Sequence, residues 1–397
     1  MKANGQRNFR WLYLKNGNAV TQLRKLGPAP KSPPKGGTEA YIGDFLHNIT
    51  GQPVMLLSCS LTNESLSMGP VRARCFDLSD GSDTSAALKL FQLFRTSVIV
   101  SIMMIRFKPD RVICGRLGLL LWLASLIARF RGSLFVFSSH NDMHLSRTTS
   151  LKKLEMHLNN FFIKRATGAI CNGPFLRQQL LDIGLKSEKV FEFGARYDDF
   201  LENARSLNSD ESQFDLPGRF LLFVGRVEMN KGVFDLLEAF CKAAFPDLSL
   251  VFAGDGASLA SLRQTIEEKQ AKSRVLCLGR VPHEALAAIM HEALAVVTPT
   301  RSVFPEGRPK VVMEALAVGT PVIAPKFGTF PYLIQHRENG LLYHADNVDA
   351  LSSAIALLAT DKDLHQSLKS RIRRSNKNEE PARSFFQAAE QAFNRQI

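Results

Sequence analysis

The sequence predicts an α/β protein built from two doubly wound domains. Its 397 residues exceed what one ordinary hydrophobic core accommodates. Short apolar runs alternate with helical patterns, and a polar stretch ending in Pro-Gly, "SLNSDESQFDLPG", separates two halves. We therefore expect a first domain over 1–205, a linker over 206–218, a second domain over 219–372, and a C-terminal helix within 373–397 that packs back across the junction.

The second half shows the alternation most clearly. Its near-continuous apolar runs are typical of parallel strands that are covered on both faces. These predicted strands are 220–226, 248–254, 274–280, 294–300 and 321–325, with helical patterns between them. The first half has the same rhythm at 53–59, 111–116, 134–140, 168–172 and 189–194. Two Rossmann-like domains facing a cleft are expected, with ligands at the carboxyl ends of the strands.

Net charge is distributed unevenly along the chain. Residues 1–205 contain 28 Lys and Arg against 15 Asp and Glu, whereas residues 206–397 contain 22 of each. A one-sided basic field indicates an anionic partner, which is a membrane lipid, a nucleic acid or a phosphorylated substrate. A merely solvated basic surface is the alternative. We favour an anionic membrane surface and expect no nucleic-acid partner.

Cysteine usage and apolar runs bear on the compartment. The six cysteines are scattered without a CxxC pair, which suits free thiols in a reducing compartment. The first 20 residues lack an apolar core of signal-peptide length. The run "LLLWLASLIA" at 119–128 is too short to span a bilayer and is interpreted as a buried helix, with docking at a membrane interface as the alternative. We therefore expect a cytoplasmic protein, peripheral on the inner face of the membrane.

The stretch "FPEGRPKVVMEALAVGTPVIA" at 304–324 contains two carboxylates eight positions apart. Pro309 suits the first helical turn, so Glu306 should lie in the loop before a helix and Glu314 in its second turn. A helix N-terminus beside a loop carboxylate can hold an anionic, hydroxyl-rich ligand. A surface glutamate beside an ordinary helix–strand connection is the alternative.

Two cations are expected at the carboxyl end of the strand "FLLFVGR". Gly225 and Arg226 close this strand, and Lys231 opens the next helix. A guanidinium and a nearby ammonium group suit two adjacent phosphates, as in a nucleoside diphosphate. A solvated pair of loop cations is the alternative.

Two positions in the first half could also contact a ligand. Gly36 and Gly37 open a helix after a Pro-rich segment, where a phosphate can approach backbone N–H groups, although most such pairs are turns. His140 ends the strand "LFVFSSH", again at a carboxyl end, which favours ligand contact, with a core role as the alternative. The Asp-x-Asp triplet at 361–363 follows a helix rather than a strand, so we interpret it as a connection and expect no metal site.

Taken together, these features resemble the retaining glycosyltransferases of family 4, which have the GT-B fold and include enzymes of bacterial envelope and capsule synthesis. The landmarks in chain order are "GGTE", "KPD", "SSHN", "FVGRVEMNKG", "AGDG", "LGRVPHEAL", "EGRPKVVMEALAVGTPVIA" and "NGLLY". The match is continuous in the second half and limited to landmarks in the first. The sequence departs from the family at "KFGTFPYLI", where Phe327 and Tyr332 replace a glycine and a glutamate.

The resemblance implies roles for particular residues. Arg226 and Lys231 would bind the diphosphate and stabilise it as it leaves, Glu314 would bind the ribose, and Glu306 would contact sugar hydroxyls. The donor site would also include Gly36, Gly37, His140, Gly225, Gly307, Arg308, Pro309 and Lys310.

The resemblance also implies a reaction, which is transfer of a hexose from a UDP- or GDP-sugar to a glycan or lipid-linked acceptor, with retention and without metal or cofactor. Two other functions are compatible with the sequence. One is a GT-B-fold isomerase or hydrolase that uses a nucleotide sugar, and the other is a non-catalytic basic protein that binds membrane or nucleic acid.

Overall fold

A computed structural model describes most of the chain and divides it into two compact units. Unit 1 comprises Met1–Arg196 and Ala382–Ile397, and unit 2 comprises Tyr197–Pro381. Gly36, Gly37 and most of the predicted linker lie outside the described residues. The described residues are 8–30, 39–60, 62–77, 86–140, 150–194, 200, 214–304, 306–378 and 383–394.

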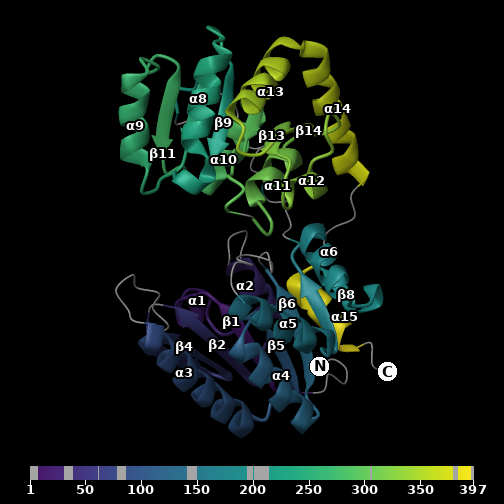
Figure 1. The fold of residues 1–397 in the computed structure, drawn as a ribbon. Coiled ribbons are helices and arrows are strands. Elements are labelled where there is room, and N and C mark those ends of the chain that lie inside the picture. Colours follow the sequence, from purple (N-terminus) through teal and green to yellow (C-terminus); the bar gives the residue numbers. More distant parts are fainter. Residues whose placement is uncertain are drawn as a thin grey trace. The chain divides into compact units, whose positions relative to one another are not determined.

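The described part of unit 1 contains a sheet in the order β3-β4-β2-β1-β5-β6-β7-β8 (Figure 1). Every neighbouring pair is parallel except β3 and β4, which form an antiparallel hairpin at the edge. The strands are β1 (Trp11–Asn16), β2 (Val54–Ser60), β3 (Glu64–Met68), β4 (Val71–Asp77), β5 (Arg111–Cys114), β6 (Leu134–Ser139), β7 (Gly168–Cys171) and β8 (Val190–Glu192).

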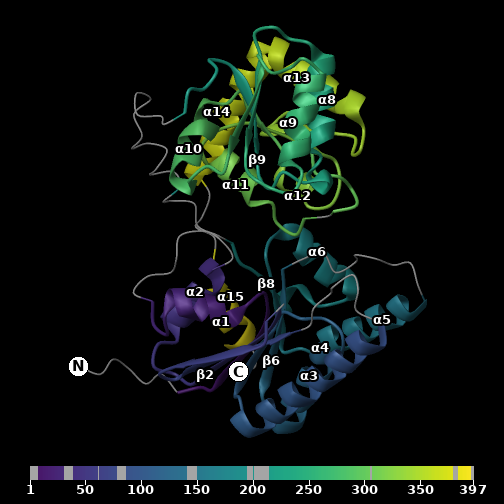
Figure 2. The same ribbon diagram turned by 90° about the vertical axis from the view of Figure 1, so that its left-hand side faces the viewer.

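Helices cover both faces of this sheet, as Figure 2 shows. Alternate residues of β1 point to opposite faces, so Leu12 and Leu14 pack with one set of helices while Trp11 and Tyr13 pack with the other. The first set is α3 (Ala86–Phe107), α4 (Leu119–Arg131), α5 (Ser150–Lys164) and α6 (Pro174–Ile183). The second set is α1 (Ala19–Leu26), α2 (Glu39–Asn48) and α15 (Phe385–Asn394).

The described part of unit 2 has a fully parallel sheet in the order β11-β10-β9-β12-β13-β14. Numbered within the unit, this is the 3-2-1-4-5-6 order of a dinucleotide-binding fold. The strands are β9 (Phe220–Val224), β10 (Ser249–Ala253), β11 (Val275–Gly279), β12 (Ala295–Val297), β13 (Val322–Pro325) and β14 (Gly340–Tyr343). The predicted fold class, two doubly wound α/β domains, is confirmed.

Helices also enclose the sheet of unit 2 on both faces. One core contains side chains of α8 (Val233–Ala243), α9 (Leu259–Glu268) and α13 (Val348–Thr360). The other contains side chains of α10 (His283–Glu292), α11 (Lys310–Ala317) and α12 (Phe330–Leu333). Local sequence sets the ends of these helices; for example, the side chain of Asn347 accepts a hydrogen bond from the backbone N–H of Ala350 at 2.9 Å and caps α13.

The C-terminal segment forms two helices rather than one. Residues 373–378 continue α14 (Lys362–Asn378), which packs in unit 2. The last helix, α15, packs in unit 1, where Phe385, Ala389 and Phe393 are buried. Arg111 of β5 forms an ion pair with Glu390 of this helix, and its guanidinium lies 4.9 Å from the ring centre of Trp11. The final helix is therefore part of the core of unit 1.

Candidate active site

The candidate site lies where the strand order of unit 2 reverses. β9 and β12 are neighbours in the sheet, but the chain leaves them toward opposite sides. The loops that follow these two strands diverge at their carboxyl ends, which leaves room for a ligand at this point in doubly wound sheets. Residues 225–232 follow β9, and residues 298–309 follow β12.

A lysine and a glutamate join these two loops. Lys231 Nζ lies 2.8 Å from Glu306 Oε1, and both side chains are largely buried, at 16% and 18% exposure. Thr300 donates a hydrogen bond from Oγ1 to the same carboxylate oxygen at 2.8 Å. The ammonium group also lies 4.7 Å from the ring centre of Phe304. The lysine is therefore held at the carboxyl end of the sheet by Glu306, which Thr300 orients in turn, and by an aromatic ring.

Close backbone packing fixes the loop after β9. Gly232 has φ +69°, and a Cβ added there would lie 1.9 Å from the carbonyl oxygen of Pro299. Arg301 donates its backbone N–H to Asn230 O at 3.0 Å and binds both carboxylate oxygens of Asp235 at 2.7 and 2.8 Å. A larger residue at position 232 would separate the two loops, and with them Lys231 and Glu306.

The Gly-Asp-Gly turn at 254–256 packs against the backbone of the same loop. A Cβ at Gly254 would lie 1.8 Å from the carbonyl oxygen of Gly225, and Val227 donates its N–H to Asp255 O at 2.9 Å. The sequence predicted a tight turn here rather than a ligand site, and the structure shows what the turn does. It positions the backbone that carries Arg226.

Arg226 behaves differently from Lys231. Its side chain is 63% exposed and its Nη1 lies 2.7 Å from Glu228 Oε1 within the same loop. Both predicted cations thus follow β9, but the structure brings only Lys231 into contact with Glu306. The ion pair of an exposed arginine contributes little to stability, so Arg226 can exchange Glu228 for an incoming anion at small cost.

The second predicted carboxylate lies on α11. The helix begins at Lys310 with Pro309 immediately before it, so Pro309 is the N-cap rather than a residue of the first turn. Glu314 lies in the second turn as predicted, is 8% exposed, and has its Oε1 3.1 Å from Nε2 of His283 on α10. Burial lowers the pKa of Lys310 on the same helix, an effect that the charge of Glu314 opposes.

Unit 1 has a separate polar cluster at the carboxyl ends of its strands. His140 directly follows β6, and its Nε2 lies 2.8 Å from Ser138 Oγ and 3.5 Å from the hydroxyl of Tyr13. Its ring packs against Tyr41, Phe193 and Phe385. Burial, and then the nearby charge of Lys15, lower the pKa of His140 to about 4.

Lys15 is a member of this cluster that the sequence analysis missed. It is a buried lysine on β1, and burial lowers its pKa to about 8. The signal was present, since "WLYLK" places a lysine at the end of an apolar strand.

Acidification should destabilise unit 1 through His140. Its folded-state pKa lies below the ordinary 6.5, so between pH 6.5 and about 4 the unfolded chain binds more protons than the folded one. The stability gap between the wild type and a His140→Gln variant should therefore shrink as the pH falls through this window. Both tryptophans, Trp11 and Trp122, lie in unit 1, so tryptophan fluorescence during urea unfolding reports this unit alone. Parallel pH profiles of the two proteins would contradict the expectation.

Some partners in the site are predictable from the sequence and others are not. The sequence pattern places Lys231, Glu306 and Glu314 at the carboxyl end of one sheet, but Thr300 and His283 were not predicted. Thr300 ends the predicted strand 294–300 and could have been identified as a polar residue at a carboxyl end. His283 begins a helix distant in sequence, and only the fold shows that it contacts Glu314.

The Asp-x-Asp triplet is a helix connection, as predicted. Asp361 follows α13 and its Oδ1 accepts a hydrogen bond from the backbone N–H of Leu364 at 2.8 Å, at the start of α14. In the part of the chain that the structure describes, no three His, Cys, Asp or Glu side chains form a group that could hold a metal ion.

Comparison with known proteins finds similarity mainly in the second half of the chain. Residues 205–375 match the family model "Glycosyl transferases group 1". N-acetyl-alpha-D-glucosaminyl L-malate synthase of Bacillus anthracis is 27% identical over 158 residues, which is 40% of each chain. D-inositol 3-phosphate glycosyltransferase of Corynebacterium glutamicum is 31% identical over 198 residues, or 47% of this chain and 45% of that protein. The chain thus spans less than half the length of these two relatives.

Solved structures resemble the whole chain. HepE of Anabaena, crystallised in complex with UDP, has a TM-score of 0.68 at 16% identity, covering 96% of this chain and 98% of that one. At this identity the likeness shows the fold, which is the two-domain α/β fold of the GT-B type.

Proposed function

We propose that this chain is a retaining glycosyltransferase that moves a hexose from a UDP- or GDP-sugar to a glycan or lipid-linked acceptor. One observation carries the proposal: Lys231, Glu306 and Thr300 form a hydrogen-bonded group at the switch point of a 3-2-1-4-5-6 sheet, inside the segment that matches the group 1 glycosyl transferases. Anabaena HepE, which has a similar fold, binds UDP, and this supports a nucleotide donor.

The donor diphosphate would lie over the loop after β9. Lys231 is fixed there, and the exposed Arg226 can turn from Glu228 to the phosphates. Glu306 would contact the sugar hydroxyls, helped by the backbone N–H groups of Gly307, Arg308 and Lys310 near the start of α11. Glu314, oriented by His283, would bind the ribose.

The reaction would proceed by front-face attack. The bond between the anomeric carbon and the diphosphate oxygen breaks, and its electron pair goes to the nucleoside diphosphate. The acceptor hydroxyl forms a bond to the same face of that carbon and passes its proton to the leaving phosphate. Negative charge grows on the diphosphate, so preorganised cations beside it stabilise the transition state more than the ground state. Lys231 and Arg226 would supply this charge, with neither metal nor cofactor required.

The charge distribution supports a proposal for the acceptor and for the location of the enzyme. The positive excess lies in residues 1–205, which form most of unit 1. A lipid-linked acceptor of a bacterial envelope or capsule pathway would present anionic groups to this unit. We propose peripheral contact with an anionic membrane surface, and the free cysteines suit a location in the cytoplasm.

A product assay tests this proposal. Purified protein is incubated with UDP-glucose or GDP-mannose and a set of lipid-linked acceptors, and free nucleoside diphosphate is measured with and without EDTA. We expect release that requires acceptor, an α-linked product by NMR from these α-linked donors, and the same rate after chelation. Release without any acceptor would indicate a hydrolase, a β-linked product would exclude retention, and loss of activity in EDTA would exclude the metal-free reaction.

A further inference from the structure

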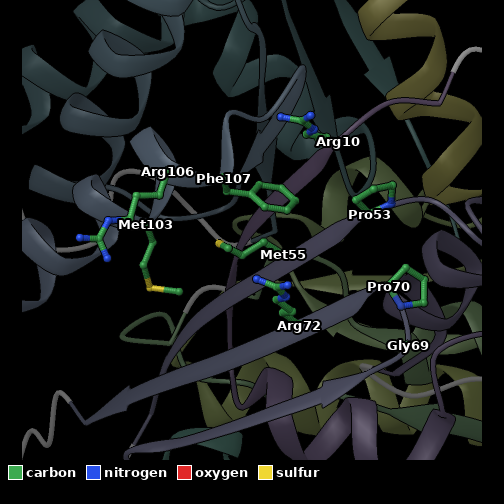
Figure 3. A pocket seen from close by; sticks show the side chains of 9 residues that line it. All are labelled: Arg10, Pro53, Met55, Gly69, Pro70, Arg72, Met103, Arg106 and Phe107. Atoms are coloured by element: carbon green, nitrogen blue, oxygen red, sulfur yellow. The ribbon is translucent and has the colours of Figure 1, made fainter.

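A cavity of about 560 Å³ lies in unit 1, at the amino ends of the strands, whereas His140 lies at the carboxyl ends. It opens where β1, β2 and β4 begin and where α3 ends. Figure 3 shows Met55 and Phe107 between Arg10 and Arg72, with Arg106 beside Met103. The lining residues are Arg10, Pro53, Met55, Gly69, Pro70, Arg72, Met103, Arg106 and Phe107.

The three arginines of this cavity are unpaired. Within the described residues, the guanidinium groups of Arg10, Arg72 and Arg106 have neither an ion pair nor a hydrogen bond. The adjacent acid is Asp110, whose carboxylate accepts the backbone N–H of Arg10 at 2.8 Å. The cavity therefore has cations along its lining, and a phosphate group offers them several acceptor oxygens.

The rest of the lining is apolar. Met55, Met103 and Phe107 form a hydrocarbon surface between the arginines, together with Pro53 and Pro70. An inorganic anion gains nothing from such a surface, whereas a phosphate ester that carries hydrocarbon buries apolar area against it. The cavity therefore suits an amphiphile with a phosphate head group.

An exposed apolar stripe runs along α3 toward this cavity. On the stripe Phe91, Phe94, Val98, Ile102 and Ile105 follow each other at steps of three or four residues, so they share one helix face. The opposite face is buried in unit 1 through Thr96, Ser97, Val100 and Met104. The helix ends in Arg106 and Phe107, which line the cavity, so stripe and cavity are continuous.

The neighbouring surface is strongly basic. Helices α3, α4 and α5 together contain eight Lys and Arg and one acidic residue, Glu155. Further exposed apolar side chains on α4 and α5 include Phe130, Leu154 and Phe161. The segment Leu90–Phe107 is also long and apolar enough to cross a membrane, with 22% of it buried. Since polar and apolar residues of α3 pack in the core of unit 1, the helix fits the interface better than the bilayer interior.

We infer that the arginine cavity binds the phosphate of an anionic phospholipid while the apolar stripe of α3 lies in the interface of the same membrane. The inference rests on the proposed contact with a membrane and identifies the surface that makes it. Exposed hydrocarbon on α3, and a cavity of about 560 Å³ lined by cations and apolar side chains, are together what one leaflet of anionic lipid satisfies.

This lipid would be an anchor rather than the acceptor. The cavity lies at the amino ends of the strands, whereas the polar cluster of His140 lies at their carboxyl ends. Strands of about six residues separate the two edges by roughly 20 Å. A phospholipid in the cavity therefore leaves the polar cluster of His140 free.

Vesicle co-sedimentation of the full chain tests the anchor. Vesicles of phosphatidylcholine are compared with vesicles that also contain phosphatidate, at low and high salt. The cavity variant is Arg10→Gln/Arg72→Gln/Arg106→Gln. The matched control, Arg129→Gln/Arg131→Gln/Lys153→Gln, removes the same charge from exposed positions of α4 and α5 outside the cavity. A stripe variant, Phe91→Gln/Phe94→Gln/Ile102→Gln, tests insertion.

We expect the wild type to bind vesicles only when they contain phosphatidate, and we expect salt to weaken this binding. Compared with the wild type, the vesicle affinity of the cavity variant should fall about 100-fold, and that of the control should fall by less than about tenfold. The stripe variant should also bind weakly. The inference is overturned if the cavity variant binds vesicles like the wild type or like the control. It is also overturned if glycerol 3-phosphate, a free phosphate ester, competes fully with the vesicles at equal phosphate concentration. Failure of alkaline carbonate to extract the protein would indicate a membrane-spanning helix, and self-association through the stripe would indicate a protein interface, and either result would contradict the inference.

The same preparations separate this inference from the proposed enzyme activity. Binding of UDP and GDP is measured by calorimetry on each variant, since no changed residue belongs to unit 2. Unchanged nucleotide binding with unchanged vesicle binding refutes only the anchor. Vesicle binding that depends on the cavity, in a protein that binds no nucleotide, would support the anchor and refute the glycosyltransferase proposal.

Discussion

Replacing Lys231 with alanine is expected to lower kcat about 100- to 1,000-fold, because it removes a preorganised charge beside the leaving diphosphate. The structure gives a reason to expect the large effect from this residue rather than from Arg226. Lys231 is held by Glu306 and the ring of Phe304, whereas Arg226 is exposed and pairs within its own loop. A fixed cation needs little reorganisation when charge develops, so its loss should affect kcat more than KM.

Single-turnover kinetics with a saturating donor would measure the chemical step directly. Lys231→Ala is compared with Lys269→Ala, which removes an exposed lysine at the end of α9. Calorimetric unfolding of both variants checks that unit 2 remains folded. A kcat within about threefold of the wild type in folded Lys231→Ala protein would show that this ammonium does not stabilise the transition state.

Gly232→Ala is expected to destabilise unit 2 by about 3 kcal/mol or more, which places it among the severe point substitutions. Two causes add. The residue has φ +69°, which costs about 1–2 kcal/mol for a side chain. The new Cβ would also lie 1.9 Å from the carbonyl oxygen of Pro299, so one loop must move. Because that movement separates Lys231 from Glu306, the Gly232→Ala variant should also bind nucleotide more weakly than the wild type.

Gly279→Ala is the matched control for this substitution. Gly279 also has φ +69°, but a Cβ there would have nothing within 4 Å. The difference between the two variants, measured by calorimetry of the full chain, isolates the clash with Pro299. If both variants lose the same stability, the close approach of the two loops is not a constraint on the fold.

The sequence predicted the strands of unit 2 well because they are covered on both faces. Their apolar runs need no tertiary information, and the predicted range 220–226 differs from β9 only at its carboxyl end. The end strand β14 was not predicted as a strand, since "GLLY" is short. Unit 1 was harder to predict because the hairpin β3–β4 contains alternating polar residues such as Ser65 and Arg72.

The candidate site was predictable where one loop or helix holds the residues. One loop contains Gly225, Arg226 and Lys231. The start of one helix, α11, lies between Glu306 and Glu314. Contacts between elements were not predictable. That Lys231 bonds Glu306, 75 positions away, and that His283 bonds Glu314 depend on the strand order, which the sequence pattern does not specify. The same holds for the exposed stripe of α3, since periodicity alone cannot show which face of a helix is buried.

Hydrogen exchange with and without UDP or GDP tests the central claim most directly, because it maps where a nucleotide binds without requiring the acceptor. If the switch point of unit 2 holds the donor, saturating nucleotide should slow exchange in residues 225–232 and 298–312 and leave the edge strand β14 unchanged. Protection confined to other segments, or no protection by either nucleotide, would contradict the assignment of this site.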